Sequence, residues 1–166
     1  MKTKFKNIET HTFGDFPQVD EIAPNFTLVN SDLFDISLED FQGTRLILNI
    51  FPSLDTSVCA MAVRRFNNLA ANFKNTTVLC ISKDLPFAQK RFCVAEGISN
   101  VIALSDCRPE SRFGVDYGVL IADGAFRGLF ARAIIVISED GKILYTKLNQ
   151  EIAEEPDYDA VLKEIS

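Results

Sequence analysis

The sequence contains no tryptophan, only one histidine and no pair of cysteines separated by two residues. Structural zinc sites need clustered cysteine or histidine ligands, so the isolated His11 and the scattered cysteines argue against that kind of site. The missing C-x-x-C spacing also argues against a disulfide oxidoreductase of protein thiols, because that motif places both exchanging sulfurs at one helix start.

Long apolar runs and an excess of basic residues are missing too. No stretch approaches the run of about eighteen apolar residues that a membrane-spanning helix needs, so we expect no membrane partner. The basic segment Met1–Ile8 is not followed by an apolar run and does not resemble a secretory signal, which favours a cytoplasmic location. The formal charge of −6 at pH 7 argues against a nucleic-acid partner, because phosphates are bound by basic patches.

What remains is the composition of a globular domain. The 166 residues are 47% hydrophobic and 24% charged, and they contain no repeat, low-complexity tract or linker. This length is close to the commonest size of a domain, so we expect a single domain over residues 1–166. A chain this long can build a sizeable core in a reducing compartment, and we expect any disulfide to be transient and catalytic rather than structural.

Apolar runs alternate with amphipathic segments along most of the chain. Nearly continuous apolar runs are typical of strands that are covered on both faces. The pattern predicts strands over 46–51, 76–82, 100–104, 133–137 and 142–147. It predicts helices over 57–74, 87–96 and 156–165, with short helical turns over 37–41 and 110–117.

The remaining segments complete the predicted topology. Residues 1–30 hold short β-prone pieces at 4–8 and 25–29, which indicates an N-terminal β extension. The turn-rich segment 106–128 is predicted to be a long surface excursion that carries function. Glu139-Asp140-Gly141 is a hairpin signal, so the sheet should end antiparallel. Together these features predict a thioredoxin-like α/β fold, with a mixed central sheet and helices on both faces.

One cysteine is predicted to lie in the first turn of the helix that follows the first strong strand. If Thr56 is the N-cap, Cys59 takes the position that a carboxylate holds in a capping box. Unpaired N–H groups and the helix dipole favour an anion there, and thiols so placed can have pKa values of roughly 3.5 to 7.5 instead of about 8.5. A nucleophilic thiolate is therefore expected. An inert core thiol stays open, because the cysteine shares a helical stripe with Val63, Phe66, Ala70 and Phe73.

The pattern Pro52-x-x-x-Thr56-x-x-Cys59 after an apolar strand resembles the active-site signature of the peroxiredoxins. The longer match is to the bacterial thiol peroxidases, which are atypical two-cysteine peroxiredoxins. The resemblance extends over nearly the whole chain and is carried by residues 49–56, 78–82, 84–89, 91–97, 122–124, 128–133 and 155–158. It implies an antioxidant enzyme that reduces hydrogen peroxide and organic hydroperoxides, needs no metal, haem or flavin, is recycled by thioredoxin and forms homodimers.

The same resemblance implies a role for each site residue. Cys59 would be the peroxidatic cysteine, Thr56 would hydrogen-bond the thiolate and the peroxide, and Pro52 would shield the thiolate. Arg132 would donate hydrogen bonds to the thiolate and the substrate oxygens. Cys93 would be the resolving cysteine, and both helices would partly unwind to form the disulfide, because the two Cα atoms must come within about 7 Å. Taken singly, these residues also fit an N-cap, a turn proline, a surface ion-pair partner and a buried thiol.

Two cysteines lie outside this assignment. Cys80 falls within a predicted strand and is expected to be an inert core residue. Cys107 lies in a polar loop beside Arg108 and is expected to be a free exposed thiol or a competing resolving residue. A thioredoxin-fold binding or adaptor protein with merely packed cysteines is the alternative to an enzyme.

Overall fold

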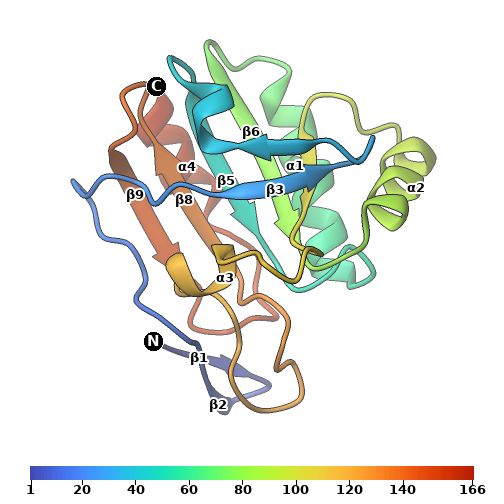
Figure 1. Ribbon diagram of the computed structural model, residues 1–166, viewed down its shortest axis with the longest axis vertical. Coiled ribbons are helices and arrows are strands. Elements are labelled where there is room, and N and C mark those ends of the chain that lie inside the picture. Colours follow the sequence, from blue (N-terminus) through green and yellow to red (C-terminus); the bar gives the residue numbers. More distant parts are fainter.

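The computed structural model describes residues 1–166 and contains a seven-stranded sheet and a separate two-stranded hairpin (Figure 1). The strands of the sheet are Thr27–Asn30 (β3), Asp35–Ser37 (β4), Arg45–Ile50 (β5), Thr76–Ser82 (β6), Ile102–Ser105 (β7), Ala133–Ile137 (β8) and Ile143–Leu148 (β9). The hairpin pairs Lys2–Phe5 (β1) with Ile8–His11 (β2). The helices are Ser57–Ala70 (α1), Pro86–Glu96 (α2), Phe113–Asp116 (α3) and Tyr158–Ile165 (α4), with a 3-10 turn at Leu38–Phe41 (η1).

The sheet is mixed, with the order β4-β3-β7-β6-β5-β8-β9. Strands β5, β6 and β7 are parallel to one another. Strand β8 pairs antiparallel with β5 and β9, and β3 pairs antiparallel with β4 and β7. The α/β prediction with an antiparallel ending is therefore confirmed. Because the carboxyl ends of parallel strands lie at one edge, the segments that follow β5, β6 and β7 meet there.

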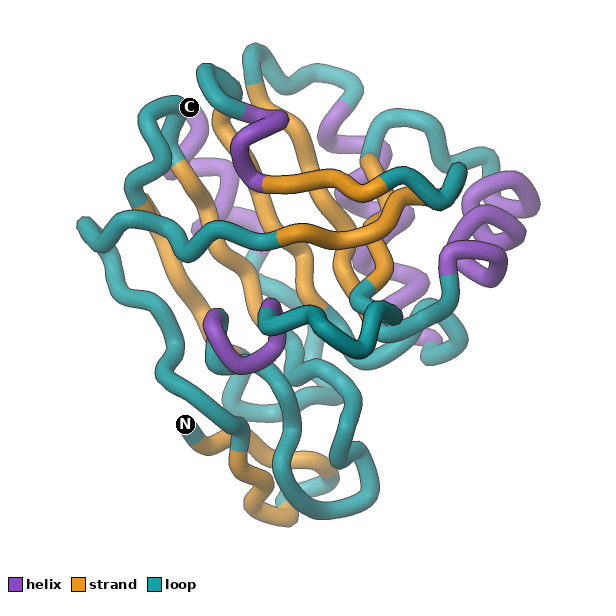
Figure 2. Tube along the Cα trace, viewed as in Figure 1, coloured by secondary structure: helices purple, strands orange, loops and turns teal.

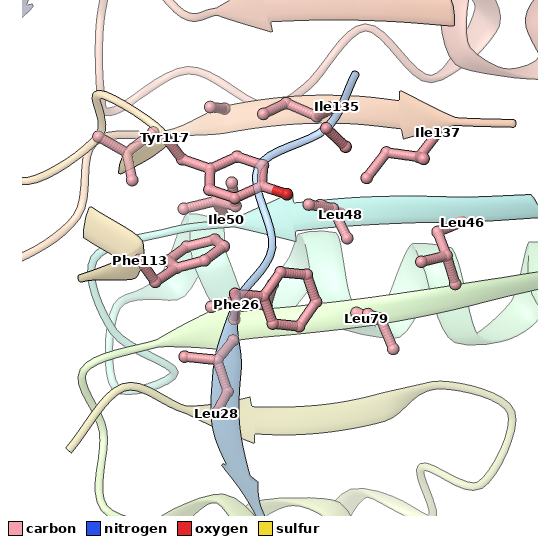
Figure 3. Close-up of a cluster of buried hydrophobic side chains, with 14 of the residues drawn as sticks. Phe26, Leu28, Leu46, Leu48, Ile50, Leu79, Phe113, Tyr117, Ile135 and Ile137 are labelled. Carbon is pink, nitrogen blue, oxygen red and sulfur yellow. The ribbon is translucent and has the colours of Figure 1, made fainter. Parts of the chain in front are cut away.

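Both faces of the sheet are buried, but they are covered differently. Helices α1 and α4 cover one face, where Phe66 and Val161 share a cluster with Val136 of β8. The other face carries the short helix α3 and the 3-10 turn η1 together with loop segments, as Figure 2 shows. Figure 3 shows Phe113 and Tyr117 from this layer against the strands. Helices on both faces are thus confirmed, with irregular backbone doing much of the covering on one of them.

The boundaries of α2 follow the predicted signals and those of α1 do so in part. Helix α2 has Pro86 in its first turn and ends at Gly97, whose φ of 65° is left-handed. Helix α1 begins at the predicted residue but ends at Ala70, four residues earlier than predicted. The chain reverses into β6 through Asn75, whose positive φ of 44° cannot continue a right-handed helix.

The prediction of one β-prone piece over residues 4–8 is wrong in detail, because the centre of this piece is the turn of the N-terminal hairpin. Lys6 and Asn7 have φ angles of 51° and 66°, and two successive positive φ angles are the mark of a type I′ hairpin turn. The hairpin is attached to the chain after β9. Thr3 Oγ1 donates to the carbonyl of Asn149 at 2.7 Å, and the Ile152 N–H donates to the carbonyl of Lys4 at 2.8 Å.

The prediction of a surface excursion over residues 106–128 is also wrong. Phe113, Tyr117, Val119 and Ile121 are at most 2% exposed. The rings of Phe113 and Tyr117 stack with centroids 4.6 Å apart, and the Tyr117 hydroxyl donates to the carbonyl of Pro24 at 2.6 Å. The glycines and polar residues of this segment indicate turns correctly, but its apolar side chains pack against the sheet and form part of the core.

A glycine inside this segment permits close packing rather than exposure. Gly118 has a φ of +62°, and a Cβ atom there would lie 2.5 Å from the backbone of Asp15 and Phe16. Gly97 has a similar φ of +65° but nothing within 4 Å of the same position. The two glycines therefore share the backbone constraint and differ only in the available space.

We expect Gly118→Ala to lower the free energy of unfolding by about 1 to 3 kcal/mol more than Gly97→Ala, because only the first adds an overpacked contact to the strained backbone. Urea unfolding followed by circular dichroism measures both variants. Equal losses in the two variants would show that the segment is free to move away from the backbone at Asp15.

Candidate active site

The turn between β5 and α1 ends in the predicted N-cap. Thr56 has an extended backbone with φ −100° and ψ 143°, and its Oγ1 accepts from the Cys59 N–H at 3.4 Å. Its hydroxyl proton is donated to the carbonyl of Ser53 at 3.0 Å. Cys59 thus lies in the first turn of α1, as predicted. The Thr56 oxygen faces it as an acceptor, because its own proton is already engaged.

Cys59 is packed as well as capped. Its side chain is 0% exposed and belongs to the same apolar cluster as Val63 and Phe66. The helical stripe seen in the sequence is therefore a core face. The sulfur nevertheless has a polar partner, because it accepts a hydrogen bond from Arg132 Nη2 at 3.1 Å. Packing and polar chemistry are combined at this one residue.

Arg132 is the largest of the almost completely buried side chains, at 1% exposure, so the surface ion-pair interpretation is wrong. It lies directly before β8. Its Nε donates to the carbonyl of Ile152 at 2.8 Å, while Nη1 is buried without a hydrogen-bond partner. It pairs with no carboxylate. A buried guanidinium needs hydrogen-bond acceptors, and the sulfur of Cys59 is the side-chain acceptor that the structure gives it.

A cavity of about 330 Å³ opens beside this pair. Pro52, Thr56 and Arg132 line it together with mainly apolar residues, namely Phe5, Ser57, Val58, Phe126, Ile152 and Ala153. The rings of Phe5 and Phe126 stack with centroids 4.2 Å apart, which joins the N-terminal hairpin to the loop before β8. The sequence carried no signal for Phe5 and Ile152, because distant segments supply them.

Comparison with known proteins identifies the family. The family model described as Redoxin matches residues 18–162. The chain belongs to the redoxin family. A thiol peroxidase of Corynebacterium glutamicum is 55% identical over 161 residues, which cover 97% of this chain and 96% of that protein. A thiol peroxidase of Mycobacterium tuberculosis is 56% identical over 152 residues, covering 92% and 90% of the two chains.

Solved structures agree with this assignment. A peroxiredoxin-like protein from Aquifex aeolicus superposes on this redoxin with a TM-score of 0.93 and 37% identity, covering 99% of this chain and 95% of that one. A thiol peroxidase from Chromobacterium violaceum has a TM-score of 0.89 at 24% identity over 98% and 94% of the chains, and it supports the fold alone. The thioredoxin-like fold and the thiol peroxidase relationship are confirmed, and this redoxin is an enzyme of the peroxiredoxin type.

The predicted resolving cysteine lies apart from the cavity that Thr56 and Arg132 line. Cys93 of α2 is half-buried, and burial raises the pKa of its thiol. It lines a different cavity of about 280 Å³, whose other walls come from the β3–β4 turn and the segment from α2 to β7. All four cysteines are free thiols in this structure. The fold therefore gathers Pro52, Thr56 and Arg132 around one cavity, with Cys59 hydrogen-bonded to Arg132, and it leaves Cys93 outside this group.

The other two cysteines of the redoxin lie where the sequence predicts. Cys80 is buried in the centre of β6, and burial raises the pKa of its thiol to about 12. Asn49 Nδ2 donates to its sulfur at 3.7 Å, which opposes only part of that effect. A thiol that stays protonated is a poor nucleophile, so Cys80 is inert at neutral pH. Cys107 is exposed.

Two further structural observations concern ligands and location. No three His, Cys, Asp or Glu side chains are grouped as a metal ion would require. None of the helices of the redoxin combines the length and apolar character needed to span a membrane.

We expect Arg132→Gln to slow alkylation of Cys59 by iodoacetamide about tenfold near neutral pH, because a charge-assisted hydrogen bond to the thiolate is lost. Peptide mass spectrometry reads the labelling of each cysteine separately. Arg132→Lys should keep part of the rate, since it preserves the charge. Arg127→Gln, on an exposed side chain of the preceding loop, is the control, and equal rates in R132Q and R127Q would contradict the role of Arg132.

Proposed function

We propose that this redoxin reduces hydrogen peroxide and organic hydroperoxides through the thiolate of Cys59, in a cycle that continues through a disulfide with Cys93. The observation that carries the proposal is the buried Arg132, which lacks a carboxylate partner and donates to the Cys59 sulfur at 3.1 Å. A thiolate held in this way has the charge that a peroxide-reducing nucleophile needs, and its partner Arg132 lines an open cavity together with Thr56.

In the first step the thiolate attacks the distal oxygen of the peroxide. The sulfur lone pair forms the S–O bond, the O–O bond breaks, and the leaving oxygen takes its electron pair and then a proton to become alcohol or water. Arg132 Nη1 is free of other hydrogen bonds and can donate to the leaving oxygen. Thr56 Oγ1 can accept from the peroxide O–H, because its own proton is bound to Ser53. Pro52, at the wall of the cavity, shields the thiolate from water.

In the second step Cys93 attacks the sulfenic acid formed on Cys59, so that the S–S bond forms and water leaves. The closed structure cannot perform this step, because Cys59 is fully buried and Cys93 faces a separate cavity. A disulfide requires Cα atoms within about 7 Å, so we infer that both helices partly unwind. Amide protection around residues 56–62 and 88–96 should then fall in the oxidised form.

A dithiol protein completes the cycle by supplying two electrons to the disulfide. Thioredoxin is the reductant we propose, with residues 1–166 acting as a single peroxiredoxin domain in antioxidant defence. A cytoplasmic location and a homodimer complete the proposal. The reactive sulfur belongs to the protein itself, so the cycle needs no metal, haem or flavin cofactor. The acidic net charge of −6 gives no reason to add a nucleic-acid partner.

The disulfide pairing is tested by one equivalent of peroxide followed by peptide mass mapping. We expect a link between Cys59 and Cys93, a trapped sulfenic acid on Cys59 in Cys93→Ser, and no peroxide consumption in Cys59→Ser. Cys107→Ser is the control and should behave as the unchanged chain. A link from Cys59 to Cys107 would reassign the resolving residue, and peroxide consumption by C59S would leave the chain a packed binding protein.

The apolar walls of the cavity beside Arg132 predict how the rate depends on the organic part of the substrate. Phe126→Ala should lower kcat/KM for an aromatic hydroperoxide about tenfold and leave that for hydrogen peroxide nearly unchanged, because only the larger substrate contacts the ring. Phe34→Ala removes a ring that is 68% exposed and does not line the cavity, and it serves as the control. Equal losses for the two substrates would show that Phe126 supports the fold instead.

A further inference from the structure

A carboxylate at the end of β6 holds the turn that precedes the Cys59 helix. Asp84 Oδ1 accepts from the Ser53 hydroxyl at 2.7 Å, and Oδ2 accepts from the Leu54 N–H at 2.8 Å. Oδ2 also accepts from the Ser82 hydroxyl at 2.7 Å, which anchors the carboxylate to its own strand. Three short hydrogen bonds to one carboxylate make a strong local constraint on the turn.

This constraint continues from the turn to the reactive sulfur. The carbonyl of Ser53 accepts from the Thr56 hydroxyl at 3.0 Å and from the Thr56 N–H at 3.2 Å. Thr56 in turn caps the helix by accepting from the Cys59 N–H. Asp84 therefore fixes Ser53, Ser53 orients the Thr56 hydroxyl, and Thr56 sets the first turn of α1. The carboxylate itself does not line the cavity beside Cys59.

The same group of hydrogen bonds holds the start of the other cysteine helix. Asp84 immediately precedes Leu85, the N-cap of α2. The completely buried Gln89 in α2 donates to the Ser82 hydroxyl at 3.2 Å and to the carbonyl of Leu104 at 2.9 Å. Ser82 thus bonds both to Asp84 and to the helix that carries Cys93. The two cysteine helices begin at one shared network.

We propose that Asp84 is a positioning residue that keeps the turn over residues 52–56 in its peroxide-reactive form, and that the turn must leave Asp84 before the disulfide can form. The proposal rests on the peroxidase cycle proposed above. The hydrogen bonds of Asp84 pre-organise Thr56 and Cys59 for the first step. They also resist the unwinding of α1 that the second step requires. Asp84 therefore assists one step and opposes the other.

The opposed effects define the test. Asp84→Ala should slow formation of the sulfenic acid about tenfold, measured in a C93S background where no disulfide can follow. In the chain that keeps both Cys59 and Cys93, D84A should give a lower ratio of sulfinic acid to disulfide than the unchanged chain as the peroxide concentration is raised. Sulfinic acid forms when a second peroxide oxidises the closed sulfenic acid, so faster opening diverts the sulfur to the disulfide. Peptide mass spectrometry measures both products in one sample.

Two variants separate positioning from general stability. Asp84→Asn keeps an acceptor for Leu54 and Ser82 and can donate to Ser53, so its first step should stay within about threefold of the unchanged chain. Asp140→Ala is the matched control, because this aspartate also accepts from a serine hydroxyl, that of Ser138. It lies in the hairpin after β8, at the end of the strand away from Arg132. Its loss should change neither the rate of sulfenic acid formation nor the product ratio. If D84A is too unstable to study, Ser53→Ala removes one of the three bonds and should shift both readouts in the same directions.

The outcomes distinguish this proposal from the cycle on which it depends. If the unchanged chain consumes peroxide and forms the Cys59–Cys93 disulfide, but D84A and S53A match D140A in both readouts, the role of Asp84 is overturned and the cycle stands. A D84N loss as large as that of D84A overturns the hydrogen-bonding role. If the unchanged chain forms no sulfenic acid, the cycle itself fails.

Discussion

The chemistry that we propose for this redoxin depends on a buried hydrogen bond between a guanidinium and a sulfur. Arg132 is 1% exposed and donates to Cys59 at 3.1 Å without any carboxylate to neutralise it. Burying a lone cation is costly, and hydrogen bonds to buried acceptors offset part of that cost. The contact acts on both partners, because the same hydrogen bond also holds the sulfur in place. In the proposed cycle, one contact thus serves both the stability of the core and the reactivity of the thiol.

The remaining parts of the site bring this pair to a cavity. The Arg132 guanidinium is oriented by the carbonyl of Ile152, which in turn is tied through its N–H to Lys4 of the hairpin. The stack of Phe5 on Phe126 closes the apolar side of the same cavity. The N-terminal hairpin is therefore part of the site although it lies outside the main sheet (Figure 1). Its role is to complete a wall beside the sulfur.

The proposed cycle places opposite demands on the helix starts. Reaction with a peroxide favours a closed and ordered first turn of α1, whereas disulfide formation requires that turn to open. The closed form is held by the local hydrogen bonds at Asp84. It is also held by a bidentate ion pair from Arg64 of α1 to Glu96 of α2, at 2.8 and 3.0 Å. These contacts lie at the surface or are only partly buried, so they can break while the central strands stay intact.

The sequence by itself determined the features that depend on neighbouring residues. Apolar runs predicted β5 and β6, because strands covered on both faces need them, and proline and glycine marked both ends of α2. The Thr56 cap placed Cys59 in the first helical turn for the same local reason. The roles of Arg132 and Cys93 came from resemblance to a family, since no local pattern connects them to Cys59.

Only the tertiary structure decided which distant groups surround the sulfur. The burial of Arg132, its free Nη1 and the aromatic wall of Phe5 and Phe126 depend on segments far apart in the chain. The segment over 106–128 shows the same limit, because turn signals describe the backbone path but not whether Tyr117 packs inward. Neighbouring residues determine the backbone conformation. Burial and charge compensation depend on where the whole chain brings its side chains together.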